Sequence, residues 1–498
     1  MTELRMFNFR TVFKSIFAGV ILYSSFIWSS WVLVLFSLAW LYRLLIDQPL
    51  KARFWIVLSF GLGFFVPLLR WIAVLGTDAH ALLVLLCLSF FIFLALTPVE
   101  ANSTRGKIEF AIIWAAIELL RSNFPWGGFS WGLLSYPASS SWLAQYAKIG
   151  GSTLVAIVSV LVATNLAELW KQQTLRKLVL MVVAYLLAVV LPSPPVGDSL
   201  KVGIVQSGVV GSEVSEYLRP AEVLRRQIAQ TVAHKETLRE ADFVLWPENS
   251  VNLTSFQDSA AFQIQNAVDV VNKPFIIGVV LQRADEAPRN LAVLWQPKLG
   301  PTASYAKKHL VPFGEYLPLR NLLASRISRF DQIPADFAAG SGGSIVEVGG
   351  HKIGLAICFE VADQDHLQQL VQGGAELLVT LSNNATYVAT NQPAQQFQIS
   401  RFSSLAHQRS MVIATTTGTS GVIASNGQIV SRIGHNEGAA IVSEVDLVNG
   451  KTFADRNPLR LGLILVVLAG LCYLERISQF VQRRRGAASR KDSADRVV

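Results

Sequence analysis

Long apolar runs occupy most of the first 195 positions of this chain, and one more lies near its end. Runs of roughly 17 to 25 apolar residues are long enough to cross a bilayer as helices. Eight such runs are predicted to be transmembrane helices, at residues 12–29, 30–46, 54–75, 81–98, 108–122, 149–169, 177–194 and 458–474. Charged residues make up only 15% of the chain, whereas soluble domains average about 25%. The chain is therefore predicted to be an integral membrane protein.

Lysine and arginine residues are distributed unevenly between the termini and loops of this eight-span arrangement. The set that is rich in them comprises residues 1–14, 43–53, 105–107, 171–177 and the C-terminal tail. Because cytoplasmic loops carry an excess of Lys and Arg, both termini are predicted to be cytoplasmic and residues 197–455 to lie outside the cytoplasm. The net charge of +9 largely reflects this bias. The basic tail favours a membrane surface, and not nucleic acid, as its partner.

The segment between the seventh and eighth apolar runs has a different pattern. Short apolar stretches such as ADFVLWPE and KIGLAICFE predict β-strands, and the SNG sequence at 425–427 is typical of a hairpin turn. Polar helical patterns separate the strands, at residues 219–239, 256–271, 364–373 and 391–409. We therefore expect a layered α/β domain at 197–455, between a membrane domain at 1–196 and a last span with a basic tail at 456–498.

Cys358 is the only one of the three cysteines that lies outside the predicted spans, since Cys87 and Cys472 fall within them. A structural disulfide would therefore lack a second cysteine in the outer domain. No histidine-rich spacing accompanies Cys358, which makes a metal site improbable. The residue type alone fits either a buried core cysteine or a nucleophile.

Three chemically complementary side chains follow predicted strands. Glu248 comes after FVLWP, Lys307 follows a strand end, and Cys358 ends another apolar strand. Working residues of α/β sheets gather at strand ends. A thiol can attack a carbonyl, a nearby cation can lower its pKa, a carboxylate can accept its proton, and a lysine can stabilise the oxyanion. The alternative is three unrelated groups: a helix cap, a surface lysine and a core cysteine.

The three stretches WPE, YAKKHLVPFGEYLP and GLAICFE are similar, in order and spacing, to the Glu-Lys-Cys motifs of the carbon–nitrogen hydrolase (nitrilase) superfamily. The HLVPFGEYLP form, together with WAAIELLRSNFPWGGFSW in the membrane half, resembles the apolipoprotein N-acyltransferase family. The resemblance covers about residues 100–475. It implies a nitrilase-like αββα sandwich inserted in a polytopic α-helical membrane domain, located in the bacterial inner membrane.

The resemblance also assigns roles to residues. It implies that Glu248 is the general base, Lys307 the stabilising lysine and Cys358 the nucleophile. Glu315 and Glu360 match supporting carboxylates of the active site.

Further positions are expected to contact substrate. Arg121 and Trp126, near the aromatic stretch FPWGGFSW, are expected to border the path of the lipid, with Arg121 meeting its phosphate. The alternative is an interfacial aromatic belt and an Arg121–Glu118 pair. Asn383 is a possible substrate-binding residue. The following Asn384 stands where the family usually has Asp, and such departures are expected to shape a lid or acceptor-binding surface.

The resemblance implies a two-step transfer without a metal or organic cofactor. A phospholipid donates an acyl chain to Cys358, and the α-amine of a diacylglyceryl-cysteine at an apolipoprotein N-terminus accepts it. Two alternatives remain open. One is a membrane-tethered amidase that transfers the acyl group to water, and the other is a catalytically silent lipoprotein-binding protein.

Overall fold

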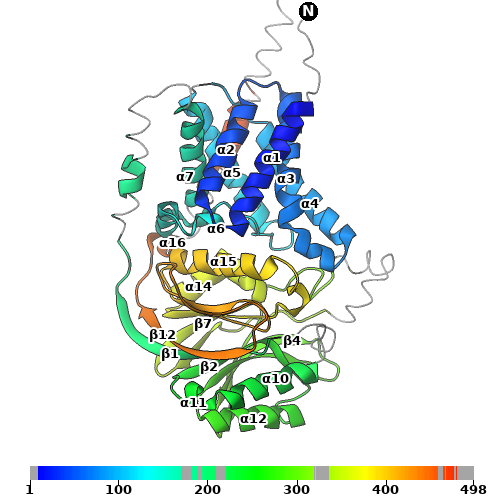
Figure 1. Ribbon diagram of the computed structural model, residues 1–498, viewed down its shortest axis with the longest axis vertical. Coiled ribbons are helices and arrows are strands. Elements are labelled where there is room, and N and C mark those ends of the chain that lie inside the picture. Colours follow the sequence, from blue (N-terminus) through cyan, green and yellow to red (C-terminus); the bar gives the residue numbers. More distant parts are fainter. Residues whose placement is uncertain are drawn as a thin grey trace, which may run out of the picture.

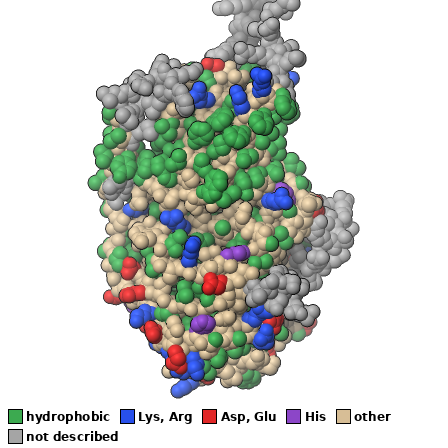
Figure 2. Space-filling view, in the orientation of Figure 1, with side chains coloured by type: hydrophobic (Ala, Val, Ile, Leu, Met, Phe, Trp, Pro, Cys, Tyr) green, Lys and Arg blue, Asp and Glu red, His purple; other side chains and the backbone are tan. Residues whose placement is uncertain are grey.

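A bundle of helices stands on a domain of two β-sheets in the computed structural model (Figure 1). The structure describes residues 9–101, 103–169, 192–208, 220–318, 320 and 336–457, with shorter stretches within 179–190 and 462–478. Hydrophobic side chains cover most of the helical half, whereas charged side chains are spread over the sheet half (Figure 2). The two halves therefore present different surfaces to their surroundings, as expected for a protein that is only partly embedded in a membrane.

The longer helices of the bundle occupy the positions of the first six predicted spans. They are α1 (Phe9–Ile27), α2 (Trp31–Leu45), α3 (Leu50–Leu68), α4 (Thr77–Ala95), α5 (Thr104–Asn123) and α7 (Ala147–Leu169). Among the described residues, four helical stretches are long and apolar enough to cross a membrane, namely Phe9–Ile27, Leu50–Leu68, Thr77–Ala95 and Trp142–Glu168. The predicted spans at 177–194 and 458–474 lie largely outside the described residues, so the number eight stays a prediction.

The helices α3 and α5 differ from the apolar spans that were predicted at their positions. α3 ends at Leu68 and not near residue 75, because Pro67 lies in its last turn and proline cannot continue the hydrogen-bond ladder. α5 carries charged side chains, and Lys107 among them is paired with another helix inside the bundle. Lys107 Nζ lies 2.5 Å from Glu168 Oε2 of α7 and 3.1 Å from Asn165 Oδ1. Pairing of this kind lets charges lie among membrane helices.

In the described part of the outer domain, two six-stranded sheets pack face to face. The first has the order β12-β1-β2-β3-β4-β5, formed by Ala439–Val448, Val196–Gln206, Phe243–Leu253, Phe275–Leu281, Arg289–Gln296 and Gly300–Ala306. The second has the order β11-β10-β9-β8-β7-β6, formed by Ile429–Ile433, Ser420–Ile423, Met411–Thr415, Leu377–Ser382, His351–Ile357 and Ile345–Val348. The predicted hairpin is present, because β10 and β11 pair antiparallel.

Helices cover the outer face of each sheet and complete an α–β–β–α order (Figure 1). The helices α10 (Pro220–Ala233), α11 (Lys235–Leu238) and α12 (Ser259–Val271) pack on the first sheet. On the second sheet lie α14 (Gln364–Gln372) and α15 (Gln392–His407), which also face the bundle. Both sheets are mixed: β1-β2-β3 and β7-β8-β9 are parallel. The carboxyl ends of these parallel strands therefore lie at one edge of the sandwich, where the polar residues that follow them come together.

Candidate functional site

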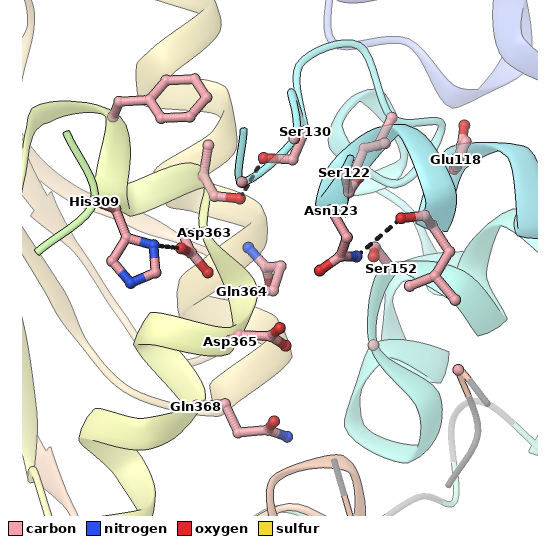
Figure 3. A pocket seen from close by; sticks show the side chains of 18 of the residues that line it. Glu118, Ser122, Asn123, Ser130, Ser152, His309, Asp363, Gln364, Asp365 and Gln368 are labelled. Carbon is pink, nitrogen blue, oxygen red and sulfur yellow. Dashed lines mark hydrogen bonds and ion pairs between the residues drawn. The ribbon is translucent and has the colours of Figure 1, made fainter. Parts of the chain in front are cut away.

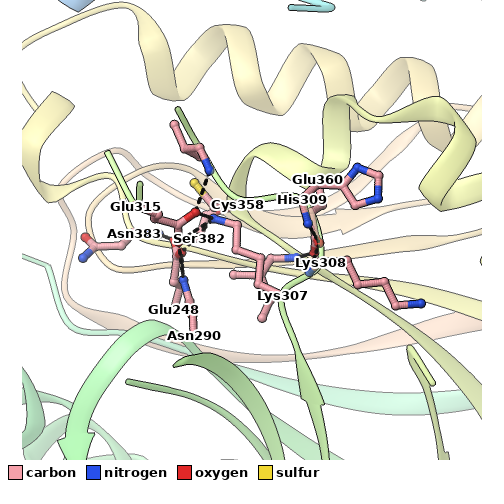
Figure 4. A network of polar contacts seen from close by, with 12 residues as sticks. Glu248, Asn290, Lys307, Lys308, His309, Glu315, Cys358, Glu360, Ser382 and Asn383 are labelled. Carbon is pink, nitrogen blue, oxygen red and sulfur yellow. Dashed lines mark hydrogen bonds and ion pairs between the residues drawn. The ribbon is translucent and has the colours of Figure 1, made fainter. Parts of the chain in front are cut away.

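Glu248, Lys307 and Cys358 come together in the outer domain (Figure 4). They lie near the helical half, because Phe359, next to Cys358, stacks on Trp131. Glu248 lies in β2, Lys307 follows the last residue of β5, and Cys358 follows β7 and opens the short helix η4 (Cys358–Ala362). Lys307 Nζ lies 3.6 Å from Glu248 Oε1, and both charges act on the pKa of the Cys358 thiol. The structure thus brings together a thiol, a carboxylate and an ammonium, a set of groups that acyl transfer through a thiol can use.

The backbone at the site is constrained at two positions, Cys358 and Gly278. Cys358 has a φ of +54°, in the left-handed region that non-glycine residues rarely occupy. Such conformations cluster at functional sites, where the surrounding structure imposes them. The neighbouring strand β3 passes Glu248 closely at Gly278, where a Cβ would lie 2.3 Å from the carbonyl oxygen of Pro247. A side chain at position 278 would therefore displace the backbone that carries Glu248.

A second carboxylate and an amide complete the network around the lysine. Glu315 Oε2 lies 2.8 Å from Lys307 Nζ. The side-chain amide of Asn290, at the start of β4, donates to both Glu248 Oε1 at 2.7 Å and Glu315 Oε1 at 2.9 Å. The backbone N–H of Asn383 donates to Glu248 Oε2 at 2.8 Å. Asn290 was not anticipated from the sequence, although an amide at the start of the apolar stretch RNLAVLW was a signal for it.

The electrostatic environment keeps the thiol protonated at rest. Burial raises the pKa of Cys358, the Glu248 carboxylate raises this pKa further, and Lys307 only partly opposes them. Burial also raises the pKa of Glu248. For Lys307, burial lowers the pKa, but the carboxylates of Glu315 and Glu248 outweigh it and the net pKa is raised. Lys307 thus lowers the pKa of Cys358, as expected of a nearby cation, but burial first and the Glu248 carboxylate second outweigh it, so the net pKa is raised.

Glu360 lies beneath the site and contacts neither Lys307 nor the thiol. It is fully buried. One oxygen accepts hydrogen bonds from the Tyr305 hydroxyl at 2.7 Å and from the backbone N–H groups of Lys308 at 2.9 Å and His309 at 3.0 Å. The other accepts from the backbone N–H of Ile357 at 2.8 Å. Glu360 thus joins the segment after Lys307 to the end of the strand that carries Cys358.

Asn383 and Asn384 take part in buried polar contacts. Asn383 Oδ1 accepts from the Thr416 hydroxyl at 3.0 Å. Asn384 is fully buried, and its amide donates to Gln396 Oε1 at 2.7 Å. Gln396 Nε2 in turn donates to the carbonyl oxygen of Cys358 at 3.2 Å. Asn384 thus supports the backbone of the cysteine turn through Gln396, and its role in a lid or acceptor-binding surface stays a prediction.

Arg121 and Trp126 occupy different environments. Arg121 is 1% exposed, and its Nη1 donates to the carbonyl oxygens of Phe129 at 2.7 Å and Trp131 at 2.6 Å. This geometry holds the aromatic loop in place and leaves the guanidinium no room at the surface for a lipid phosphate. Trp126 is half exposed and lines a cavity of about 660 Å³ between the bundle and the outer domain. Phe359, next to Cys358, also lines this cavity.

Comparison with known proteins agrees with this architecture. Residues 18–165 match the apolipoprotein N-acyltransferase N-terminal domain, and residues 171–454 match the carbon-nitrogen hydrolase family. The chain is 30% identical over 483 residues to an apolipoprotein N-acyltransferase of Mycolicibacterium smegmatis, covering 87% of this chain and 80% of the relative.

A second relative is matched over nearly its whole length. The chain is 27% identical over 487 residues to an apolipoprotein N-acyltransferase of Photobacterium profundum, covering 91% of this chain and 92% of that one. The two-sheet domain is therefore nitrilase-like, the chain is a membrane protein, and it belongs to the apolipoprotein N-acyltransferase family.

Proposed function

We propose that this protein transfers a fatty acyl chain from a membrane phospholipid to the α-amino group of the diacylglyceryl-cysteine at the N-terminus of apolipoproteins. The observation that carries the proposal is the convergence of Glu248, Lys307 and Cys358 in the outer domain, beside the contact of Phe359 with Trp131 of the helical half. Family membership supports the same substrates. Both substrates have their reacting groups at the membrane–water boundary, and the proposed orientation would place this part of the domain there.

In the first half-reaction, the Cys358 sulfur attacks the ester carbonyl of the phospholipid. Glu248 accepts the thiol proton as the carbon–sulfur bond forms, because the raised pKa of Cys358 leaves no preformed thiolate. The Lys307 ammonium stabilises the oxyanion. When the carbon–oxygen ester bond breaks, the proton returns from Glu248 to the leaving lysophospholipid. Cys358 is then a thioester and Glu248 is again a carboxylate.

In the second half-reaction, the free α-amine of the acceptor attacks the thioester carbonyl. Glu248 takes a proton from the attacking nitrogen, and Lys307 again stabilises the oxyanion. The carbon–sulfur bond breaks, and Glu248 returns the proton to the Cys358 sulfur. The product is an amide, and the enzyme is restored without a net change in protons.

We further propose that both termini are cytoplasmic and that the catalytic domain is extracytoplasmic, mounted on the inner membrane of a bacterial cell. This orientation rests on the Lys and Arg residues of the loops. The membrane domain would comprise residues 1–196, the catalytic domain 197–455, and the last span with its tail 456–498.

Mass spectrometry of a lipoprotein N-terminus tests the proposal in cells that lack any other such enzyme. Wild-type protein should yield a triacylated peptide, and so should Cys472→Ala as the matched cysteine control. Cys358→Ala should yield only the diacylated peptide. A triacylated product with Cys358→Ala would contradict the nucleophile assignment. Release of free fatty acid by the wild type, without triacylation, would show that water is the acceptor and that the protein is a hydrolase.

A further inference from the structure

A histidine–carboxylate pair lines the cavity between the helical bundle and the outer domain. His309 Nδ1 contacts Asp363 Oδ2, and both side chains border the open space (Figure 3). The Asp363 carboxylate is held in place because its Oδ1 accepts from the backbone N–H of His366 at 3.0 Å, as the N-cap of α14. The His309 side chain is 42% exposed. The pair is therefore built into the fold, and a bound molecule can reach its imidazole ring.

This pair is connected to the segments that carry the reacting groups. His309 comes two residues after Lys307, and its backbone N–H donates to Glu360 Oε1 at 3.0 Å. Glu360 in turn comes two residues after Cys358. Phe359, which lies between them in the chain, lines the same cavity as His309. A group that approaches Cys358 through the cavity would therefore pass the imidazole ring.

The partner of Nδ1 determines which ring nitrogen of His309 can accept a proton. A carboxylate only accepts hydrogen bonds, so Nδ1 of the neutral ring carries the hydrogen and Nε2 has a free lone pair. Nε2 has no hydrogen-bond partner among the residues that the structure describes. A carboxylate on Nδ1 also stabilises the imidazolium that forms when Nε2 takes up a proton. His309 and Asp363 thus have the arrangement of a general base and the group that orients it.

The charges around His309 set the pH range in which it can act as a base. The hydrogen bond with Asp363 raises its pKa, burial lowers it, the charges of Asp363 and Glu360 raise it, and the Lys308 ammonium lowers it; the net pKa is raised. A raised pKa makes His309 a stronger base, but it also means that the ring becomes protonated, and stops acting, at a higher pH as the pH falls. Titratable groups face the pair from the segment after β5, from η4, from α14 and, across the cavity, from α5, namely Lys308, Glu360, Asp365, His366 and Glu118.

The proposed acyl transfer leaves one proton without an acceptor. An α-amine with a pKa of about 7.7–8.0 is mostly an ammonium at pH 7, and an ammonium has no lone pair with which to attack. Its nitrogen must lose one proton before the attack and a second one as the amide forms. Glu248 passes the second proton to the Cys358 sulfur, so the first proton needs another acceptor. Water is a poor choice, because a site that is open to water would hydrolyse the thioester.

We infer that His309, oriented by Asp363, is the base that accepts the first proton of the acceptor ammonium, an inference that rests on the proposed transfer to an amine. The N–H bond of the ammonium breaks, its electron pair stays on nitrogen, and the proton goes to His309 Nε2. The neutral amine then attacks the thioester carbon, with Glu248 as the base of that step. The imidazolium gives its proton to water after the amide has formed. His309 thereby generates the reactive amine beside Cys358 without opening the thioester to water.

Single-turnover transfer tests the inference with full-length protein in mixed micelles. Enzyme that carries the thioester, preloaded from phospholipid, is mixed with an acceptor lipopeptide between about pH 6 and pH 9. His309→Asn keeps an N–H donor for Asp363 but has no basic nitrogen. Transfer by this variant at pH 7 should be about a hundredfold slower than in the wild type, the lower end of general-base catalysis. At about pH 9 the amine is neutral without help, and the two rates should differ by less than about threefold.

Two controls separate proton transfer from the folding of the site. Hydroxylamine, whose nitrogen is neutral at pH 7, needs no base before it attacks, so its reaction with the thioester should be equally fast in the wild type and in His309→Asn. His351→Asn alters a similar pair, formed by His351 and Glu376 at 2.8 Å away from the cavity lining, and should keep the wild-type pH profile. Equal slowing with lipopeptide and hydroxylamine in His309→Asn would overturn the inference.

Asp363→Asn tests the role of the carboxylate. Asparagine still accepts from His366 as a helix cap, but its NH₂ group can donate to Nδ1 and so move the ring hydrogen to Nε2. Transfer at pH 7 should slow as much as in His309→Asn, and the double variant should be no slower than either single variant. Losses that multiply in the double variant would show that the two residues act separately, and the inference would be wrong.

The same assay separates this inference from the proposed function. A wild-type thioester that passes its acyl group to water and not to the lipopeptide would refute the proposed function, and the inference with it. Normal transfer by the wild type, with the same rate in His309→Asn at pH 7, would refute the inference alone.

Discussion

At the scale of single residues, the site consists of one cation between two carboxylates beside a protonated thiol. Lys307 lies 2.8 Å from Glu315 and 3.6 Å from Glu248. The Lys307 ammonium therefore interacts mainly with the two carboxylates, and it does little to stabilise a Cys358 thiolate in the resting enzyme. Proton transfer to Glu248 must then accompany the attack, which makes the ionisation of Glu248 the condition for reaction.

The pH dependence of acylation should report this ionisation. Glu248 must be charged to accept the thiol proton, so the rate should fall as pH drops through its pKa, which burial holds above the ordinary value. Asn290 donates to the carboxylate and lowers that pKa. Asn290→Ala should therefore move the acid limb of the Cys358 acylation profile upward by about one pH unit. Asn252→Ala, at an exposed position of β2, the strand that carries Glu248, is the control.

A profile of Asn290→Ala that matches the wild type would show that Glu248 does not set the acid limb. Recovery of the rate at higher pH distinguishes this electrostatic effect from a loss of folded protein, which lowers the rate at every pH.

Sequence patterns predicted some residues of the site and not others, for a physical reason. Lys307 and Cys358 follow apolar strands and Glu248 follows the apolar stretch FVLWP, and the three form a chemically complementary set, so position and residue type together point to them. Glu248 was predicted to come after its strand, but β2 continues to Leu253 with an irregular register after Trp246. Asn290 and Gln396 act through contacts with residues more than thirty positions away in the chain. Such contacts depend on how the strands and helices pack, which short patterns do not encode. Arg121 was expected to bind a lipid phosphate. A guanidinium can donate to a phosphate or to backbone carbonyls, and in the structure Arg121 donates to the carbonyls of Phe129 and Trp131.

At the scale of elements, apolar periodicity predicted most strands and helices of the outer domain, because each element buries one face. The order of the strands was not predicted. Strand β1 pairs with β12, more than 200 residues later, and local sequence patterns do not predict which distant strands pair. The helix α5 was predicted from its length, but the pairing of Lys107 with Glu168 of α7 was not.

Glu360 shows how one buried side chain connects elements. Its carboxylate accepts four hydrogen bonds that link the segment after β5 to the end of β7. Glu360→Gln replaces one acceptor oxygen with an NH₂ donor, which faces N–H groups that then have no acceptor. We expect a loss of about 2–3 kcal/mol in the free energy of unfolding. Denaturation of the detergent-solubilised protein, followed by tryptophan fluorescence, measures it.

Tyr305→Phe is the matched control, because it removes only one of the four donors and should cost about 1 kcal/mol. If Glu360→Gln were no less stable than Tyr305→Phe, the backbone hydrogen bonds to Glu360 would not contribute to holding the two segments together.

At the scale of the whole molecule, side chains of the catalytic domain contact the helical bundle close to Cys358. Trp131 Nε1 donates to Gln395 Oε1 of α15 at 2.6 Å, and Gln395 Nε2 donates to the Leu68 carbonyl at the end of α3 at 3.2 Å. The rings of Trp131 and Phe359 are stacked, with centroids 6.1 Å apart. These contacts fix the position of Cys358 relative to the membrane helices, and hence relative to a lipid that those helices present.

Trp131→Phe tests whether this position matters for the reaction. The substitution keeps an aromatic ring against Phe359 but removes the donor to Gln395, so a buried acceptor loses its partner at a cost of about 1–3 kcal/mol. We expect acylation of Cys358 by phospholipid in proteoliposomes to slow about tenfold. Labelling of Cys358 by a small water-soluble thiol reagent should stay at the wild-type rate, because the network of Glu248 and Lys307 is not touched. Gln257→Leu, at an exposed position of the outer domain remote from the bundle, should change neither rate. Equal slowing of both reactions in Trp131→Phe would mean that the interface maintains the folding of the site and does not set its position relative to the membrane.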